Sequence, residues 1–129
     1  MKKRYIRILA IICAILAVAF IRRSQLDRSK LRHALNLRQL PPTTRIVGAG
    51  GESWTDYLFV ADLTISPDHF DKLLSGRNFS EKKYFPERVE SDAYLKLRPL
   101  NVSRSWFSSG CLVSANEAKT RAYVRYISD

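Results

Sequence analysis

The chain has 129 residues, 26% of them charged and 46% hydrophobic, and a formal net charge of +10. This length leaves room for one small folded domain. The excess charge is confined to residues 1–45, which carry eleven lysines and arginines and one acid, whereas residues 46–129 carry eleven of each sign. A neutral domain gives no electrostatic footprint for a phosphate backbone, so nucleic acid is not expected as a partner of the domain.

The N-terminus holds fourteen consecutive apolar residues, positions 8–21, behind the basic start MKKRYIR. With Tyr5, Ile6 and Arg7 the run extends toward seventeen residues, a length that is short for a membrane span but workable. The run is too uniformly apolar for an amphipathic helix of a soluble protein. We therefore predict that residues 1–21 form a transmembrane anchor and that the lipid bilayer is a partner.

A cleaved secretory signal is the competing interpretation of the same run. Ala17-Val18-Ala19 matches a cleavage site that would release a chain starting at Phe20. Against cleavage, the apolar run continues past this site and is followed at once by Arg22 and Arg23. Both flanks are basic. The count of cations favours a cytoplasmic domain, whereas the short basic start is hard to translocate and favours an extracytoplasmic one. Of the two sides, we favour the extracytoplasmic one.

Residues 22–52 are predicted to form a basic juxtamembrane helix and a linker. The helix is expected over residues 24–40, where helix-forming residues continue up to Pro41-Pro42, and the glycines of residues 48–51 are expected to form a second break. The segment either rests on anionic lipid headgroups or is a solvated stalk. Its candidate lipid-binding side chains are Arg22, Arg23, Arg28, Lys30 and Arg32.

Residues 53–129 are predicted to form a small α+β domain. Residues 57–65 alternate between two faces, which indicates a strand. Ser66 as N-cap, Pro67 at the first position and Gly76 beyond the end then predict a helix with an apolar stripe. Residues 111–115 and 120–127 predict a hairpin, and residues 93–97 a further strand. The expected assembly is an antiparallel sheet of three to four strands with one helix packed on it.

Three motifs resemble parts of nucleotide-binding, metal-binding or catalytic sites, but each lacks a feature that such a site requires. IVGAGG at residues 46–51 lacks the helix that a dinucleotide-binding loop opens, so a flexible connector is favoured. The acids and histidine at residues 62–71 crowd a helix start, where they stabilise the helix dipole, and do not converge as metal ligands. Residues 108–111 offer hydroxyls and a thiol without a base nearby. We assign no cofactor, no metal and no catalytic residue, and an enzyme is the least favoured class.

Aromatic residues are frequent in the second half of the domain, and most are expected in the core, because a domain of this size needs large buried side chains. Trp106 and Tyr123 are the candidates for exposure. With Arg104, Arg121 and Arg125 they would form a partner-binding surface, since Trp, Tyr and Arg dominate interface energetics. The leading hypothesis is a membrane-anchored protein-interaction module that uses this surface or a sheet edge. The alternative is a binder of anionic lipid or nucleic acid through residues 22–45.

Overall fold

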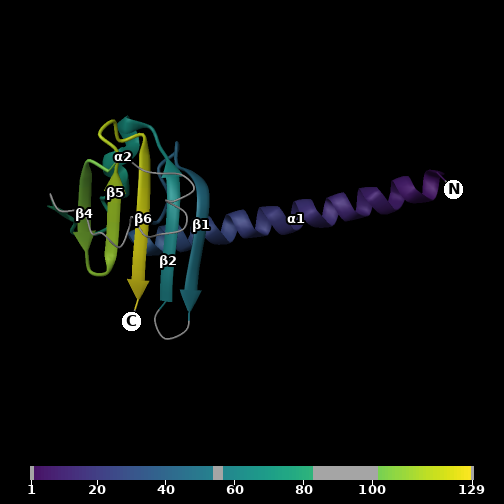
Figure 1. Cartoon of the computed structure of the whole chain (residues 1–129), viewed down its shortest axis with the longest axis horizontal. Coiled ribbons are helices and arrows are strands. Elements are labelled where there is room, and N and C mark those ends of the chain that lie inside the picture. Colours follow the sequence, from purple (N-terminus) through teal and green to yellow (C-terminus); the bar gives the residue numbers. More distant parts are fainter. Residues whose placement is uncertain (1, 54–56, 83–101, 129) are drawn as a thin grey trace.

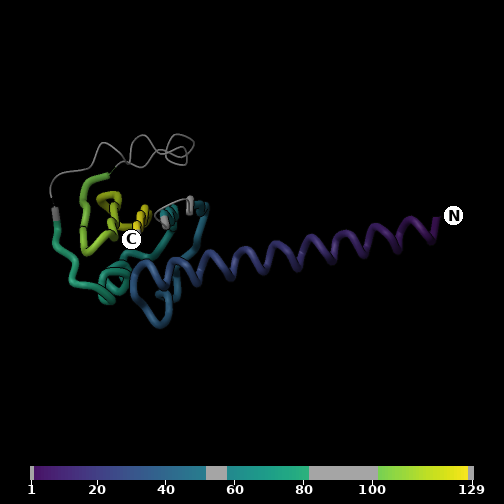
Figure 2. The backbone as a smooth tube through the Cα atoms, turned by 90° about the horizontal axis from the view of Figure 1, so that it is seen from below, coloured from purple at the N-terminus to yellow at the C-terminus, as the bar shows by residue number. Residues whose placement is uncertain are grey.

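One helix, α1 (Lys2–Leu35), contains the apolar run and continues without a break into the basic segment. The computed structural model describes residues 2–53, 57–82 and 102–128. In it α1 extends far beyond the domain that follows (Figures 1 and 2). Its N-terminal part is long and apolar enough to cross a membrane, and none of this part is buried against the domain.

The described sheet has six antiparallel strands in the order β1-β2-β6-β5-β4-β3. The strands are β1 (Arg45–Ser53), β2 (Tyr57–Thr64), β3 (Ser80–Lys82), β4 (Arg104–Ser108), β5 (Cys111–Ala115) and β6 (Arg121–Ser128). The α+β class and the β5–β6 hairpin are confirmed, but the prediction of three to four strands is too low. The predicted strand at residues 93–97 lies outside the described residues.

The edge strand β1 includes the glycines for which a flexible break is predicted. All of residues 48–51 pair with β2, and the register shifts between Ile46 and Gly48. Glycine weakens a strand in isolation because it has no side chain to pack. Here a Cβ on Gly51 would lie 2.2 Å from the carbonyl oxygen of Leu58, so the close approach of the two backbones requires glycine.

Both helices cover the same face of the sheet and form one core with it. The short helix α2 (Pro67–Leu73) contributes Phe70 and Leu73, and the ring of Phe70 lies 5.1 Å from that of Trp106. Pro67 begins α2 as predicted, whereas the Ser66 side chain makes no cap hydrogen bond. Gly76 is not among the described residues with positive φ, so the predicted left-handed ending of this helix is wrong.

The C-terminal end of α1 is the second helical part of the core. Leu31, Ala34 and Leu35 are completely buried in the same cluster as the sheet residues. The helix crosses beneath β6, β2 and β1 and leaves the domain past β1, while β4 lies on the opposite side (Figure 1). The basic segment is therefore not a solvated stalk over its whole length, because its last turns belong to the domain.

Asn36 ends α1 earlier than the predicted boundary at residue 40. It adopts a left-handed conformation, with φ of 54°. Its N–H donates to the carbonyl of His33 at 3.1 Å, and the N–H of Leu37 donates to that of Arg32 at 2.9 Å. These two bonds form a Schellman motif, with asparagine in the place usually taken by glycine. Arg77 adds a further cap, because its Nε donates to the Ala34 carbonyl at 2.7 Å.

The left-handed backbone at Asn36 yields a stability prediction. Asn36→Ala and Asn36→Gly both remove the bond that the Asn36 amide donates to the Gly76 carbonyl. Only alanine also carries the steric cost of a left-handed backbone, about 1 kcal/mol. Urea unfolding of the full chain in detergent should therefore show Asn36→Ala to be the less stable variant by about this amount. Equal stability of the two variants would contradict the assigned helix ending.

Candidate functional site

The predicted aromatic surface is not formed, because its two aromatic residues are buried on opposite faces of the sheet. Trp106 pairs with Val113 on the helix-covered face and is 7% exposed. Tyr123 is 1% exposed and lies on the other face, where its cross-strand neighbours are Asp62 and Ser114. The expectation that both are exposed is wrong, since strand alternation in β4 and β6 directs each into a packed layer.

The three arginines predicted with them do not converge on one surface either. Arg104 is exposed and lies 3.7 Å from a carboxylate oxygen of Glu81. Arg121 donates to both carboxylate oxygens of Asp62, at 3.1 Å and 2.9 Å. Arg125 is half-buried between its cross-strand partners on β2 and β5. Each arginine thus has a separate environment.

The five candidate lipid-binding cations all lie on α1 and are all exposed. At 100° per residue their spacing distributes them around the helix axis and does not gather them on one side. Arg28 donates to the Thr44 carbonyl at 3.2 Å, and Arg32 donates to the Arg38 carbonyl at 3.1 Å. These two side chains therefore stabilise the loop that leads from α1 into β1.

The acids and histidine of residues 62–71 have separate partners. Asp62 faces Arg121, the Nδ1 atom of His69 lies 2.8 Å from the Thr43 hydroxyl, and Asp71 lies 3.8 Å from Lys119. Within residues 2–53, 57–82 and 102–128, no group of three or more metal-ligating side chains is present.

Cys111 is unsuited to act as a nucleophile. It is completely buried, and burial raises the pKa of its thiol to about 11, although the nearby Arg77 guanidinium acts in the opposite direction. A thiol with this pKa is protonated at neutral pH, and the thiolate is the reactive form. Cys111 is therefore a packing residue.

A row of polar side chains crosses the face of the sheet opposite the helices. Asp62, Tyr123, Ser114 and Ser105 are direct neighbours on β2, β6, β5 and β4. The two serine hydroxyls lie 3.0 Å apart, and all four residues are at most 3% exposed. A ligand would have no access to them, so we interpret the row as a structural element that fixes strand register.

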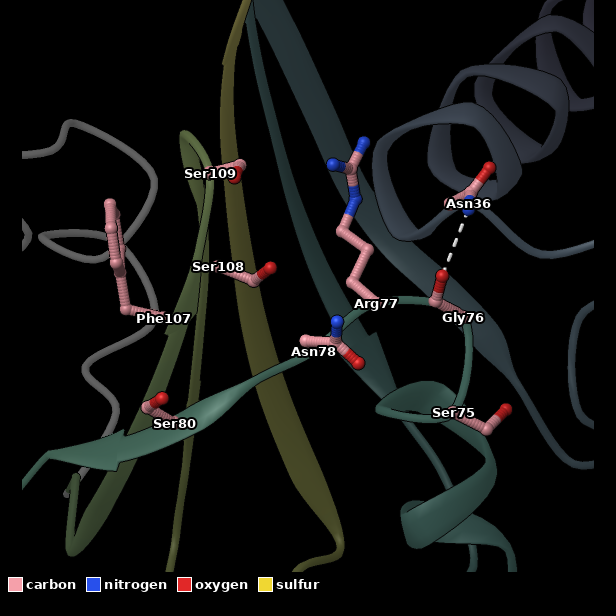
Figure 3. A pocket seen from close by; sticks show the side chains of 9 residues that line it. All are labelled: Asn36, Ser75, Gly76, Arg77, Asn78, Ser80, Phe107, Ser108 and Ser109. Atoms are coloured by element: carbon pink, nitrogen blue, oxygen red, sulfur yellow. Dashed lines mark hydrogen bonds between the residues drawn. The ribbon is translucent and has the colours of Figure 1, made fainter.

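An accessible polar pocket lies at the C-terminal end of α1 (Figure 3). This end of the helix is on the side of the domain away from the apolar run (Figure 1). The volume of the pocket is about 570 Å³. Three segments far apart in the sequence line it, with residues Asn36, Ser75, Gly76, Arg77, Asn78, Ser80, Phe107, Ser108 and Ser109. The C-terminal cap of α1 thus forms one wall of the pocket and the β4–β5 turn another.

Four polar side chains of this pocket have no hydrogen-bond partner within the described residues: Asn78, Ser80, Ser108 and Ser109. Beside them, Phe107 is 40% exposed. Arg77, by contrast, already has partners within the domain. It caps α1, and its guanidinium carbon lies 5.1 Å from the centre of the Tyr126 ring. The pocket therefore offers amide and hydroxyl groups beside one exposed aromatic ring.

Sequence reasoning missed this pocket because its lining comes from three separated segments. Ser108 and Ser109 were considered only as nucleophiles, and Phe107 only as one aromatic among many. The local signal was a concentration of serine, asparagine and glycine at turns, which is typical of any loop.

Comparison of the chain with known protein families, with characterised proteins and with solved structures finds no match. Its function therefore has to be argued from the geometry of these residues.

The buried thiol gives a test of the packing at β5. With a pKa of about 11 in place of 9.0, the thiolate fraction of Cys111 at pH 8 falls about a hundredfold, to about one in a thousand. We expect iodoacetamide to leave Cys111 unmodified in the folded Cys13→Ser chain at pH 8, and to modify it after unfolding in urea. Because folding raises the pKa of this thiol, the folded state favours its protonated form. The contribution of this preference to the free energy of unfolding is fully present below pH 9 and is lost as the pH rises toward 11. Rapid labelling of the folded chain would contradict this packing.

Proposed function

We propose that the chain is a single-pass membrane protein whose α+β domain binds another protein through the pocket at the C-terminal end of α1. The position of this pocket supports the proposal. Amide and hydroxyl side chains without a partner among the described residues lie beside the exposed Phe107, at the end of the domain away from the apolar run. A domain anchored by that run presents this end away from the bilayer.

The anchoring part of the proposal rests on exposed apolar surface. Large side chains of the run, such as Ile11 and Leu16, are about 60% exposed in the isolated chain. A continuous apolar helix of this kind is unstable in water, and a bilayer is the environment that fits its length and uniform composition. Since α1 continues into the core, an anchored domain is also held in a fixed orientation and not on a flexible tether.

The choice of a protein partner rests on the chemistry of the pocket. Sites for small molecules are predominantly apolar with a few polar groups. The described pocket has the reverse composition, because six of its nine lining residues are serine or asparagine and Phe107 supplies one aromatic ring. Hydroxyl and amide groups beside one aromatic ring fit the backbone and polar side chains of a protein segment. Among the described strands, β3 lies at an edge of the sheet and its Ser80 lines the pocket, so a sheet edge is part of the proposed surface.

The membrane anchor can be tested by fractionation. We expect the tagged full chain to stay in the membrane pellet after alkaline extraction and to have a mass that includes residues 1–19. The variant Ile12→Arg, Leu16→Arg should be released, since each arginine near the centre of a span costs about 2.5–3.5 kcal/mol. The control Ile12→Val, Leu16→Val should behave like the parent chain. A soluble product beginning at Phe20 would contradict the anchor and support the cleaved signal. Protease added to intact cells then reports the side on which the domain lies.

The pocket can be tested by site-specific photo-crosslinking in native membranes. A photoreactive phenylalanine analogue at position 107 should give a discrete crosslinked product, whereas the same analogue at Ile127, which is similarly exposed at 37%, should not. Asn78→Ala with Ser108→Ala should weaken the product from position 107. Asn78 is exposed and Ser108 is half-buried, and neither side chain has a hydrogen-bond partner within the described residues. These substitutions should therefore change stability by no more than about 0.5 kcal/mol, which thermal unfolding checks. Equal products from both positions, or none from position 107, would contradict the proposed surface.

A further inference from the structure

A second cavity lies where the apolar run of α1 ends. It is a groove of about 360 Å³ between α1 and β1, lined by Phe20, Arg23, Ser24, Asp27, Ile46, Val47, Gly48 and Ala49. Phe20 belongs to the apolar run, and Asp27 lies about 10 Å further along the helix. If the run spans the bilayer, the groove begins at the level of the lipid headgroups. The inference therefore rests on the membrane anchor proposed above.

The groove changes in character along the helix axis. At the end near the apolar run, Phe20 is 76% exposed and, on the β1 wall, Val47 is 41% exposed. One turn further along α1 a cation, Arg23, faces the groove, and one turn beyond it an anion, Asp27. The order away from the apolar run is thus apolar, positive and negative.

Neither charge is satisfied by the described residues. Arg23 and Asp27 make no hydrogen bond and no ion pair with the described residues. This distinguishes Arg23 from Arg28, which donates to a loop carbonyl. Arg23 and Asp27 are four residues apart, but the cation precedes the anion, which is the less favourable order for a pair on a helix. Both groups are therefore available to a ligand.

A phospholipid with an ethanolamine headgroup carries complementary groups in the matching order. Its acyl chains are followed by an anionic phosphate and then by a primary ammonium, so the phosphate would meet Arg23 when the ammonium reaches Asp27. A phosphate without an ammonium leaves the carboxylate without an oppositely charged partner. A quaternary ammonium has no N–H to donate to the carboxylate. We propose that this groove binds the headgroup of one phosphoethanolamine lipid.

Lipid retention by the full chain tests this proposal. The chain in non-ionic detergent is mixed with phosphoethanolamine, phosphoglycerol and phosphocholine lipids of identical acyl chains, and retained lipid is measured by native mass spectrometry. We expect about fivefold greater retention of the phosphoethanolamine lipid, the ratio that one partly exposed ion pair supplies. Asp27→Asn should remove this preference, and Arg23→Gln should lower retention of all three lipids. Arg45→Gln, which changes an exposed arginine of β1 that does not line the groove, should change neither.

Equal retention of the three lipids, or a preference that survives Asp27→Asn, would overturn the proposed lipid site. Water-soluble phosphoethanolamine that competes as well as the lipid does would also overturn it, because the apolar end of the groove would then contribute nothing. Alkaline extraction of membranes carrying the same variants separates the two failures. A chain that stays integrated but shows no lipid preference contradicts the groove alone, whereas a released chain contradicts the anchor and with it the groove.

Discussion

The insertion of the C-terminal end of α1 into the domain core is the interaction on which the rest of the structure depends. Leu31 and Leu35 are completely buried there. Burial of two leucine side chains stabilises the assembly by about 3–6 kcal/mol, a large part of the stability of a small domain. The Schellman motif at Asn36 and the cap from Arg77 satisfy carbonyl groups at this helix end, which would otherwise be left without partners beside the core. The apolar run and the sheet are thereby joined into one body.

Because α1 is docked in the domain, it fixes the positions of the two cavities relative to the apolar run. The groove beside Phe20 and Asp27 lies where α1 emerges from the domain, and the pocket beside Asn36 lies where the same helix ends. A flexible stalk would leave the domain free to turn any surface toward the bilayer. A continuous docked helix instead fixes one side near the apolar run and the other away from it, which is why we propose a lipid contact for the first and a protein contact for the second.

The opposite face of the sheet is stabilised by polar contacts in a buried setting. Asp62 is 3% exposed and accepts two hydrogen bonds from Arg121. Such a pair adds little net stability over an apolar substitute, but loss of one partner leaves a buried charge, at a cost of about 3–5 kcal/mol. The adjoining Ser105 and Ser114 hydroxyls pair only in the observed strand register. These contacts therefore favour one alignment of β2 with β6 and one of β4 with β5.

The sequence by itself determined the local elements: the apolar run, the alternation of β2, the start of α2 at Pro67 and the β5–β6 hairpin. Each of these follows from a periodicity or a turn residue within about ten positions. Tertiary structure decided the rest. The glycines of β1 form a strand because β2 supplies a partner for their backbone, and Trp106 and Tyr123 are buried because each sheet face is packed. Both cavities combine segments distant along the chain, and no local pattern encodes which distant segments meet.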